Sequence, residues 1–309
     1  MVIKKPVIIT NKNKTEITDF TFHKEDIRRT GHEALDYFRE NAWEVFQNTP
    51  IPTTREEAWR RTDIRGLKLS KIQLPGRNLK SSISDIPMEH LQPVADGDHG
   101  GQIVIYGNEV RQNLEKDLAQ KGVIFCDLLT AEKEHPELLA KIIGKVVKPE
   151  EGKFSALVSA FAQNGVFLYI PKNVSVNEPL HSLIWGAIPG YAQISHIIVY
   201  LEEGASATFV LELASDTMND SQTVVAYNIE VTVGEGADLR FVELQSLGRH
   251  VWNFSHERVS VDREGKLDWI FGAIGGHLSK NFAEMDLNAP KAVGKMSGFY
   301  FTDQEQHLD

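Results

Sequence analysis

The sequence predicts a mainly β protein in which a solenoid core follows an N-terminal helical and mixed region. Apolar residues recur at helical spacing up to about residue 150, and beyond it they alternate with polar residues as in β-strands. In this second part a glycine stands at the start of a strand-like run four times, at nearly constant spacing. We therefore divide the chain into an N-terminal region, 1–150, and a solenoid core, 151–309.

Two short helices are predicted near the start of the chain. Thr30 and Glu33 have the spacing of a capping box, and apolar residues follow on one helical face. These residues are Leu35, Phe38, Ala42, Val45 and Phe46. Two prolines then end the helix, and Thr53 and Glu56 repeat the capping spacing ahead of a second, shorter helix at 57–61.

The rest of the N-terminal region alternates between loop and helix signals. From about 67 to 101 the sequence is polar and rich in Ser, Pro and Gly, which predicts a loop with scattered strands. Helical patterns return at 112–121 and at 136–147, where Pro136 suits the first turn of a helix.

The recurrent glycines predict the coils of the solenoid. They belong to the runs EEGASATFV, GEGADLRFV, REGKLDWIF and VGKMSGFYF, and they are Gly204, Gly236, Gly265 and Gly294. Their offsets of 32, 29 and 29 residues suit a solenoid, in which each coil buries its apolar face against its neighbours. Glycine at each position would allow a turn with φ > 0. An antiparallel meander with evenly spaced hairpins is the alternative.

Composition and charge narrow the classes of function. With 43 acidic and 33 basic residues the chain carries a formal charge of −10, which disfavours nucleic-acid partners and anionic membranes. No apolar run suits a signal peptide or a membrane-spanning helix, so we expect a cytoplasmic or plastid-stromal protein. The single cysteine, Cys126, excludes an intrachain disulfide, and its apolar neighbours predict a buried structural thiol.

The sequence carries no motif of a nucleotide-binding or serine-hydrolase enzyme. GxGxxG after a strand, GxxxxGK[ST] and GxSxG are all missing, and we expect no enzyme activity. Aromatic residues of the second part are expected to fill the solenoid core. They are Trp185, Trp252, Trp269, Phe271, Phe299 and Phe301.

The segment KFSALVSAFAQNGVFLYIPKNVSVNEPLH, which begins at Lys153, resembles the start of the core domain of the SufB/SufD family. The positions that carry the likeness are Ala156-Leu157, Ala160-Phe161, Gly165 through Val174 and Pro179-Leu180-His181. GFYFTDQEQHLD at 298–309 is similar to the family's segment that ends in QH-x-D. PIPTTREEAWRRTDIRGL, at 50–67, resembles the corresponding segment of the SufD branch, and the scarcity of cysteine also favours SufD over SufB.

This resemblance implies a right-handed parallel β-helix flanked by helical regions. It also implies a scaffold subunit of the SufBC2D-type complex, which supports iron–sulfur cluster assembly and transfer with a SufB-like subunit and a SufC-like ATPase. A transient iron–sulfur cluster or a flavin would be bound by the complex, and no residue of this chain is assigned to either. Family members continue with further coils and with the helices that dock SufC, so we expect the C-terminal portion to be missing here.

His307 is the candidate metal-binding residue. It falls in the QH-x-D segment beside Asp309, and an imidazole near a carboxylate can bind iron or zinc or carry a proton. A solvent-facing or hydrogen-bonded histidine at a strand end is the alternative. The remaining candidates lack metal-site spacing and are expected at the surface or in turns; they are His181, His196, His250 and His256.

Two other functions remain open. A carbohydrate-active β-helix would use paired carboxylates within about 10 Å in a groove. Glu203, Glu235 and Glu264 do recur at the coil period, but exposed turns are their expected place. Alternatively, a purely structural scaffold would recruit a partner through the uncovered end of the solenoid, which predicts a homodimer when a SufB-like subunit is absent.

Overall fold

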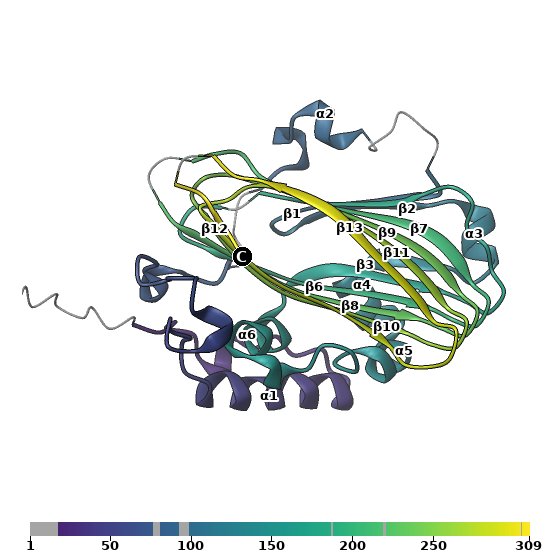
Figure 1. The fold of residues 1–309 in the computed structure, drawn as a ribbon, viewed down its shortest axis with the longest axis horizontal. Helices are drawn as coiled ribbons and strands as arrows, with labels where there is room; N and C mark the ends of the chain where they lie inside the picture. Colours follow the sequence, from purple (N-terminus) through teal and green to yellow (C-terminus); the bar gives the residue numbers. More distant parts are fainter. Residues whose placement is uncertain (1–17, 77–80, 93–98, 187, 219–220, 304) are drawn as a thin grey trace, which may run out of the picture.

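The computed structural model describes residues 18–76, 81–92, 99–186, 188–218, 221–303 and 305–309 (Figure 1). Its strands are β1 (Gly101–Tyr106), β2 (Glu109–Leu114), β3 (Ile124–Asp127), β4 (Asn164–Ile170), β5 (Leu180–Trp185), β6 (Ala192–Leu201), β7 (Ser206–Ala214), β8 (Thr223–Val233), β9 (Asp238–Leu247), β10 (Val251–Val261), β11 (Lys266–Gly275), β12 (Leu278–Leu287), β13 (Val293–Phe301) and β14 (His307–Leu308).

The helices lie mainly in the first half of the chain. The α-helices are α1 (Glu33–Asn48), α2 (Met88–Leu91), α3 (Lys116–Gln120), α4 (Leu128–Glu134), α5 (Pro136–Ile142) and α6 (Lys153–Phe161). Short 3-10 helices are η1 (Lys24–Asp26), η2 (Glu57–Trp59), η3 (Leu69–Lys71), η4 (Ile83–Asp85) and η5 (Pro149–Glu151).

The strands form two facing sheets of a parallel β-helix. One sheet has the order β13-β11-β9-β7-β5-β1-β2 and the other has the order β14-β12-β10-β8-β6-β4-β3. From β4 onward, each coil gives one strand to each sheet, and strands of successive coils pair in parallel. The predicted β-helix with an N-terminal helical region is therefore confirmed, and the antiparallel meander is wrong. Antiparallel pairing occurs at β1 with β2 and at β3 with β4.

The coils shorten along the chain, which moves the turn away from two of the four predicted glycines. Ala192 lies opposite Val224, 32 residues further on, whereas Trp252 lies opposite Leu278, only 26 residues further on. Gly204 and Gly236 have φ of 66° and 65°, as expected. At the next two turns the left-handed residues are instead Glu264 and Lys291, with φ of 57° and 65°. The prediction is thus wrong for Gly265 and Gly294, because each shorter coil turns one or a few residues earlier.

A ladder of aromatic rings runs through the interior between the two sheets. Phe209 stacks on Phe241 with ring centroids 5.7 Å apart, and Phe241 packs on Trp269 at 5.6 Å. This confirms the expected core role of Trp269. Trp185 and Trp252 are also buried, but they lie on the outer faces of the sheets and not in the interior between them. Phe271 is half-buried, but Phe299 and Phe301 are 57% and 63% exposed. Core packing is wrong for these last two, because β13 is the edge strand of its sheet.

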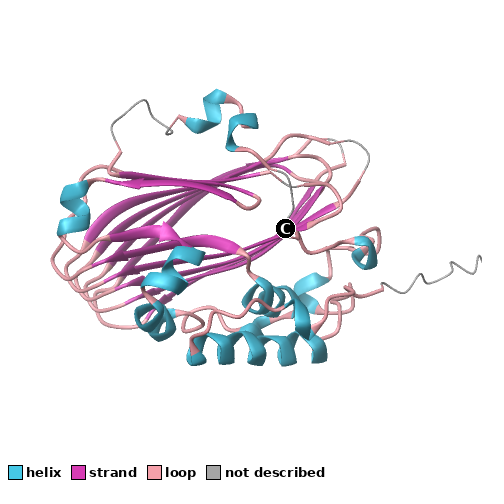
Figure 2. Ribbon diagram, turned by 180° about the vertical axis from the view of Figure 1, so that it is seen from behind, coloured by secondary structure: helices cyan, strands magenta, loops and turns pink. Residues whose placement is uncertain are grey.

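Helices cover the outer face of the sheet that contains β6, β8 and β10 (Figures 1 and 2). All nine residues of α6 are buried, because α6 lies between this sheet and α1. Phe154 of α6 stacks on Phe254 of β10 with ring centroids 3.8 Å apart. On the other sheet, Ile83 of η4 and the next residue after this helix, Ile86, pack against Leu183 of β5.

Two predicted helices differ from the structure in detail. Thr30 does not cap α1. Its backbone N–H and hydroxyl both donate to Oδ1 of Asp36, which lies in the first turn of α1. The pattern at 112–121 splits into the end of β2 and the short helix α3. Pro136 does open α5, which ends at Ile142. The second early helix is the 3-10 turn η2. In the predicted loop, 77–80 and 93–98 lie outside the described residues.

The carboxylate of Glu230 ties the segment after α5 to β8. Its Oε1 accepts from the Gly144 backbone N–H at 2.8 Å and contacts His196 Nε2 at 2.7 Å. Its Oε2 accepts from the backbone N–H groups of Val146 and Val147 at 2.9 and 3.2 Å. Because Glu230 is 1% exposed, these contacts replace water completely.

The N-terminal region and the β-helix share their sheets. The first strands, β1 to β3, precede residue 150 and pair with β5 and β4. The division of the chain at residue 150 stays a prediction. Among the helices that the structure describes, none combines the length and apolar character needed to cross a membrane.

Candidate functional site

The interior of the β-helix changes from apolar to polar in its later coils. Along β9 the inward side chains run from Leu239 and Phe241 to Glu243 and Gln245. We name the buried group that gathers here the interior polar cluster. It consists of Tyr227, Glu243, Gln245, Asn253, Ser255, Glu257 and Asn281. The cluster draws on four strands, β8, β9, β10 and β12.

Hydrogen bonds link the members of the interior polar cluster into one network. Tyr227 Oη donates to Glu243 Oε1 at 3.3 Å and accepts from the amide groups of Gln245 and Asn281. The Asn281 amide also donates to Glu257 Oε1 at 3.0 Å, and Ser255 Oγ donates to the same oxygen. The hydroxyl of Tyr227 therefore joins the two carboxyl groups through shared partners.

One oxygen of each carboxyl group has no partner outside the pair. Glu243 Oε2 and Glu257 Oε2 are buried without a further hydrogen bond among the described residues. Burial raises the pKa of Glu243 well above its usual range, and the charge of Glu257 raises it further. Burial also raises the pKa of Glu257, although hydrogen bonds from Ser255 and Asn281 oppose the shift. Burial thus favours the neutral, protonated form of both carboxyl groups.

The interior polar cluster can hold a proton, but it is closed to large substrates. Glu243 and Glu257 are 0% and 1% exposed, and the side chains around them fill the space between the sheets. The carbohydrate-active alternative requires a carboxylate pair in an open groove. Glu243 and Glu257 lie close to each other, but they are buried and do not face an open groove.

The structure places His307 in β14, at the end of the second sheet. It lies opposite Leu278 of β12, it is half-buried, and its Nε2 has no hydrogen-bond partner among the described residues. Nearby, Asp309 Oδ2 accepts from Lys280 Nζ at 2.8 Å and from the Thr62 hydroxyl. Partial burial alone would raise the pKa of Asp309, but these hydrogen bonds outweigh it and lower the pKa.

A metal site around His307 would need ligands from elsewhere. Within the described ranges, no three side chains of His, Cys, Asp or Glu gather so as to hold a metal ion. Asp309 is engaged by Lys280 and Thr62, which leaves the imidazole as a single ligand. Its assignment to metal binding stays a prediction.

The four histidines expected at the surface or in turns are all buried. Three of them, His181, His196 and His256, project from the outer faces of their strands, where the helices and the segments between them cover the sheets. His196 contacts Glu230, and His181 Nε2 lies 3.3 Å from Glu212 Oε1. His250 precedes β10 and accepts from the Met218 N–H. His250 does lie in a turn, as predicted. The prediction was wrong for His181, His196 and His256, because it took no account of these covering layers.

Two further buried groups, the His256 imidazole and the Cys126 thiol, are uncharged at neutral pH. Burial, aided by the charge of Arg258, lowers the pKa of His256 to about 4, so this imidazole is neutral. Burial and the charge of Asp127 raise the pKa of the Cys126 thiol to about 12, which agrees with the predicted structural role.

The periodic glutamates lie in the turns, as predicted, and pair with cations. Lys172 binds Glu203 at 2.6 Å and Lys291 binds Glu264 at 2.6 Å. Glu235 pairs with Arg263. These pairs are half-exposed and belong to the turn surface, so they form no catalytic set.

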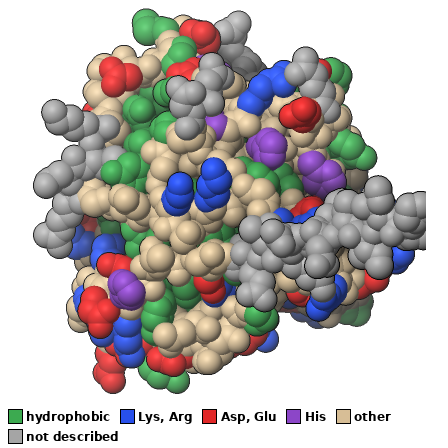
Figure 3. Space-filling view, turned by 90° about the vertical axis from the view of Figure 1, so that its left-hand side faces the viewer, with side chains coloured by type: hydrophobic (Ala, Val, Ile, Leu, Met, Phe, Trp, Pro, Cys, Tyr) green, Lys and Arg blue, Asp and Glu red, His purple; other side chains and the backbone are tan. Residues whose placement is uncertain are grey.

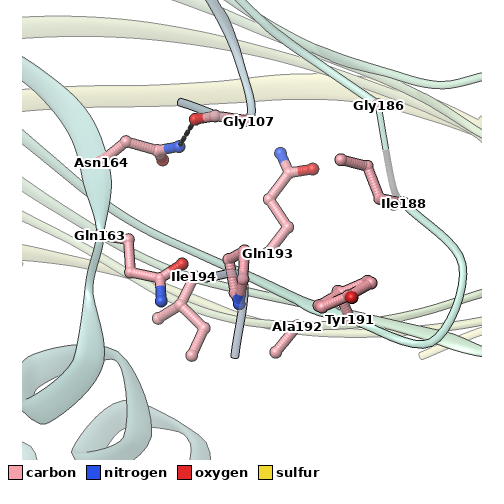
Figure 4. A pocket seen from close by; sticks show the side chains of 10 residues that line it. Gly107, Gln163, Asn164, Gly186, Ile188, Tyr191, Ala192, Gln193 and Ile194 are labelled. Atoms are coloured by element: carbon pink, nitrogen blue, oxygen red, sulfur yellow. Dashed lines mark hydrogen bonds between the residues drawn. The ribbon is translucent and has the colours of Figure 1, made fainter. Parts of the chain in front are cut away.

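A small cavity of about 20 Å³ lies near the start of β4 (Figure 4). Asn164 Nδ2 donates across it to the Gly107 carbonyl at 3.3 Å, and Asn164 Oδ1 accepts from Ser195 Oγ at 2.7 Å. Its volume suits a water molecule rather than a substrate.

Sequence reasoning missed the interior polar cluster, although a signal was present. In β9, Glu243 and Gln245 share the alternation of Leu239 and Phe241, which already marks the inward face. Polar residues at inward positions of a predicted strand are the pattern that would have indicated the cluster.

Comparison with known proteins places both parts of the chain in one family. Residues 10–181 match the model of the SufBD protein N-terminal region, and residues 185–309 match that of the SUF system FeS cluster assembly, SufBD core domain. An iron–sulfur cluster assembly SufBD family protein of Staphylococcus epidermidis is 30% identical over 65% of this chain and 43% of its own length. The homologue of Staphylococcus haemolyticus is 28% identical over 88% of this chain and 60% of its own length. The chain thus spans about half the length of these relatives.

Proposed function

Because this chain belongs to the SufBD family of iron–sulfur cluster assembly proteins, we propose that it is a scaffold subunit of a SufBC2D-type complex and not an enzyme. It supports cluster assembly and transfer together with a SufB-like subunit, and a SufC-like ATPase hydrolyses ATP. The observation that carries this proposal is the match of both 10–181 and 185–309 to the family models. The proposed location is the cytoplasm.

The segment 50–67 supports the SufD branch within this family. Trp59 packs on Phe154, Phe254 and Phe282, with ring centroids between 5.7 and 6.0 Å apart. Thr62 donates to Asp309, so the segment covers the end of the solenoid beside His307. The residues that resemble SufD therefore lie next to the candidate ligand.

In this proposal the cluster is cargo that is held between subunits. His307 supplies one ligand, and the SufB-like partner supplies thiolates, because the single cysteine here is buried and protonated. The interior polar cluster holds its proton inside the scaffold and does not contact the cargo.

The exposed face of β13 supports association with a second chain. β13 is the edge of its sheet, and its exposed apolar side chains include Met296, Phe299 and Tyr300. Exposed apolar side chains of this kind are suited to burial against another chain. Without a SufB-like subunit, two copies associate as a homodimer.

Co-purification with the SufB-like and SufC-like subunits tests this function. The protein is expressed with both, isolated under anaerobic conditions, and analysed for bound subunits, iron and sulfide. We expect a stable complex that retains a cluster, with His307→Ala lowering the iron and sulfide content. His135→Ala, a half-buried histidine between α4 and α5, is the matched control and should leave both unchanged. A complex that forms without the SufB-like subunit and still builds clusters would overturn the proposal.

A further inference from the structure

A groove of about 510 Å³ opens beside the turns that precede β10 and β12. Its walls come from segments far apart in the sequence. They are 68–72, Gly190, Met218 with 221–222, 249–252 and His277, which precedes β12. Figure 3 shows this end of the molecule, where Lys or Arg and His side chains gather on one face. Such a site depends on the fold and not on a local run of charge.

Among the described residues that line the groove, the charged side chains are all basic. Lys68, Lys71 and Arg249 line it together with two histidines, and no described lining residue is a carboxylate. Both lysines are exposed, and in the described part of the chain neither forms an ion pair. Arg249 pairs with Asp303 at 2.7 Å. In a chain of net charge −10, this local excess of positive charge attracts an anion.

The groove is held in place before any ligand binds. Gln222 Oε1 accepts from the Lys68 backbone N–H, and Gln222 Nε2 donates to the Gly66 carbonyl, each at 2.9 Å. Trp252 is buried beneath the same segment, and its indole lies beside Gly66. The His277 ring packs on the indole with centroids 4.6 Å apart. A rigid site loses little entropy on binding.

We propose that this groove binds a small ligand that bears a phosphate group. Lys68 and Lys71 hold the phosphate, because two ammonium groups with three donors each suit a multiply charged oxyanion. His277, supported by Trp252, forms the wall beside it, where the ring of an aromatic phosphate can pack. The volume agrees with that of small-molecule sites. The groove adjoins His307, whose backbone N–H donates to the His277 carbonyl at 3.0 Å, and it shares no lining residue with the interior polar cluster.

Calorimetric titration of the purified protein with inorganic pyrophosphate and with AMP tests the site. We expect saturable binding of one ligand per chain that weakens as salt rises. Lys68→Gln with Lys71→Gln should weaken binding at least about tenfold, since charged hydrogen bonds are lost. The control, Lys116→Gln with Lys121→Gln, changes the same charge on exposed lysines at α3, near the opposite end (Figure 1), and should leave the affinity unchanged.

Each outcome bears on the proposal. Tighter binding of AMP than of pyrophosphate supports an aromatic phosphate, and equal or weaker binding of AMP supports the phosphate alone. Lack of saturable binding for both probes, or an equal loss of affinity in the two double variants, overturns the site. Because all four lysines are exposed, circular dichroism should show that both double variants fold.

Discussion

Replacing Glu230 with glutamine removes one acceptor from a carboxylate that makes four buried contacts. If the new amide nitrogen takes the place of Oε2, the backbone N–H groups of Val146 and Val147 both lose their acceptor. If it takes the place of Oε1, Gly144 loses its acceptor, and His196 can partly adapt by changing its tautomer. Each buried donor without a partner costs about 1–3 kcal/mol. We therefore expect Glu230→Gln to lower the free energy of unfolding by about 2–4 kcal/mol.

Urea titration followed by tryptophan fluorescence measures this loss. Glu203→Gln is the matched control, because it makes the same chemical change in an exposed pair with Lys172. Exposed pairs of this kind contribute about 1 kcal/mol or less. Hydrogen exchange should also quicken at residues 144–147 in Glu230→Gln alone. If the two variants lose equal stability, the anchoring role of Glu230 is refuted.

Two further predictions concern the turns and the interior. Gly236→Ala should cost about 1 kcal/mol in urea unfolding, since a Cβ there meets open space and only the left-handed backbone opposes it. Glu264→Asn, at the equivalent turn, should cost nothing or add about 0.5 kcal/mol, and an equal loss in both variants would contradict this. Because burial raises the pKa of Glu243 above its ordinary 4.5, the folded state keeps a proton that the unfolded chain releases, so this contribution to stability is present below about pH 4.5 and falls as pH rises. Melting temperatures from pH 5 to 8 should fall less steeply for Glu243→Gln, and an unchanged slope would remove Glu243 as the cause.

The candidate sites differ in how far residues close together in the sequence could predict them. His307 could be selected from a short motif, but its environment depends on Lys280 and Thr62, and the latter is 245 residues away in the sequence. The interior polar cluster left a signal in the alternation of β9, yet the pairing of Glu243 with Glu257 required the two sheets to face each other. The groove at Lys68 left no signal, because its parts meet only in the folded chain.

The sequence by itself determined the β-helix, its recurring coils and the family, because a strand's alternation and a repeated turn are local properties that each coil must satisfy. It could not determine where the turns tighten, and so Glu264 and not Gly265 adopts the left-handed conformation. Nor could it place His196 or Glu230 in the core, since the helices that bury them come from other parts of the chain. Burial and charge pairing depend on residues that are far apart in the sequence, and only the tertiary structure brings those residues together.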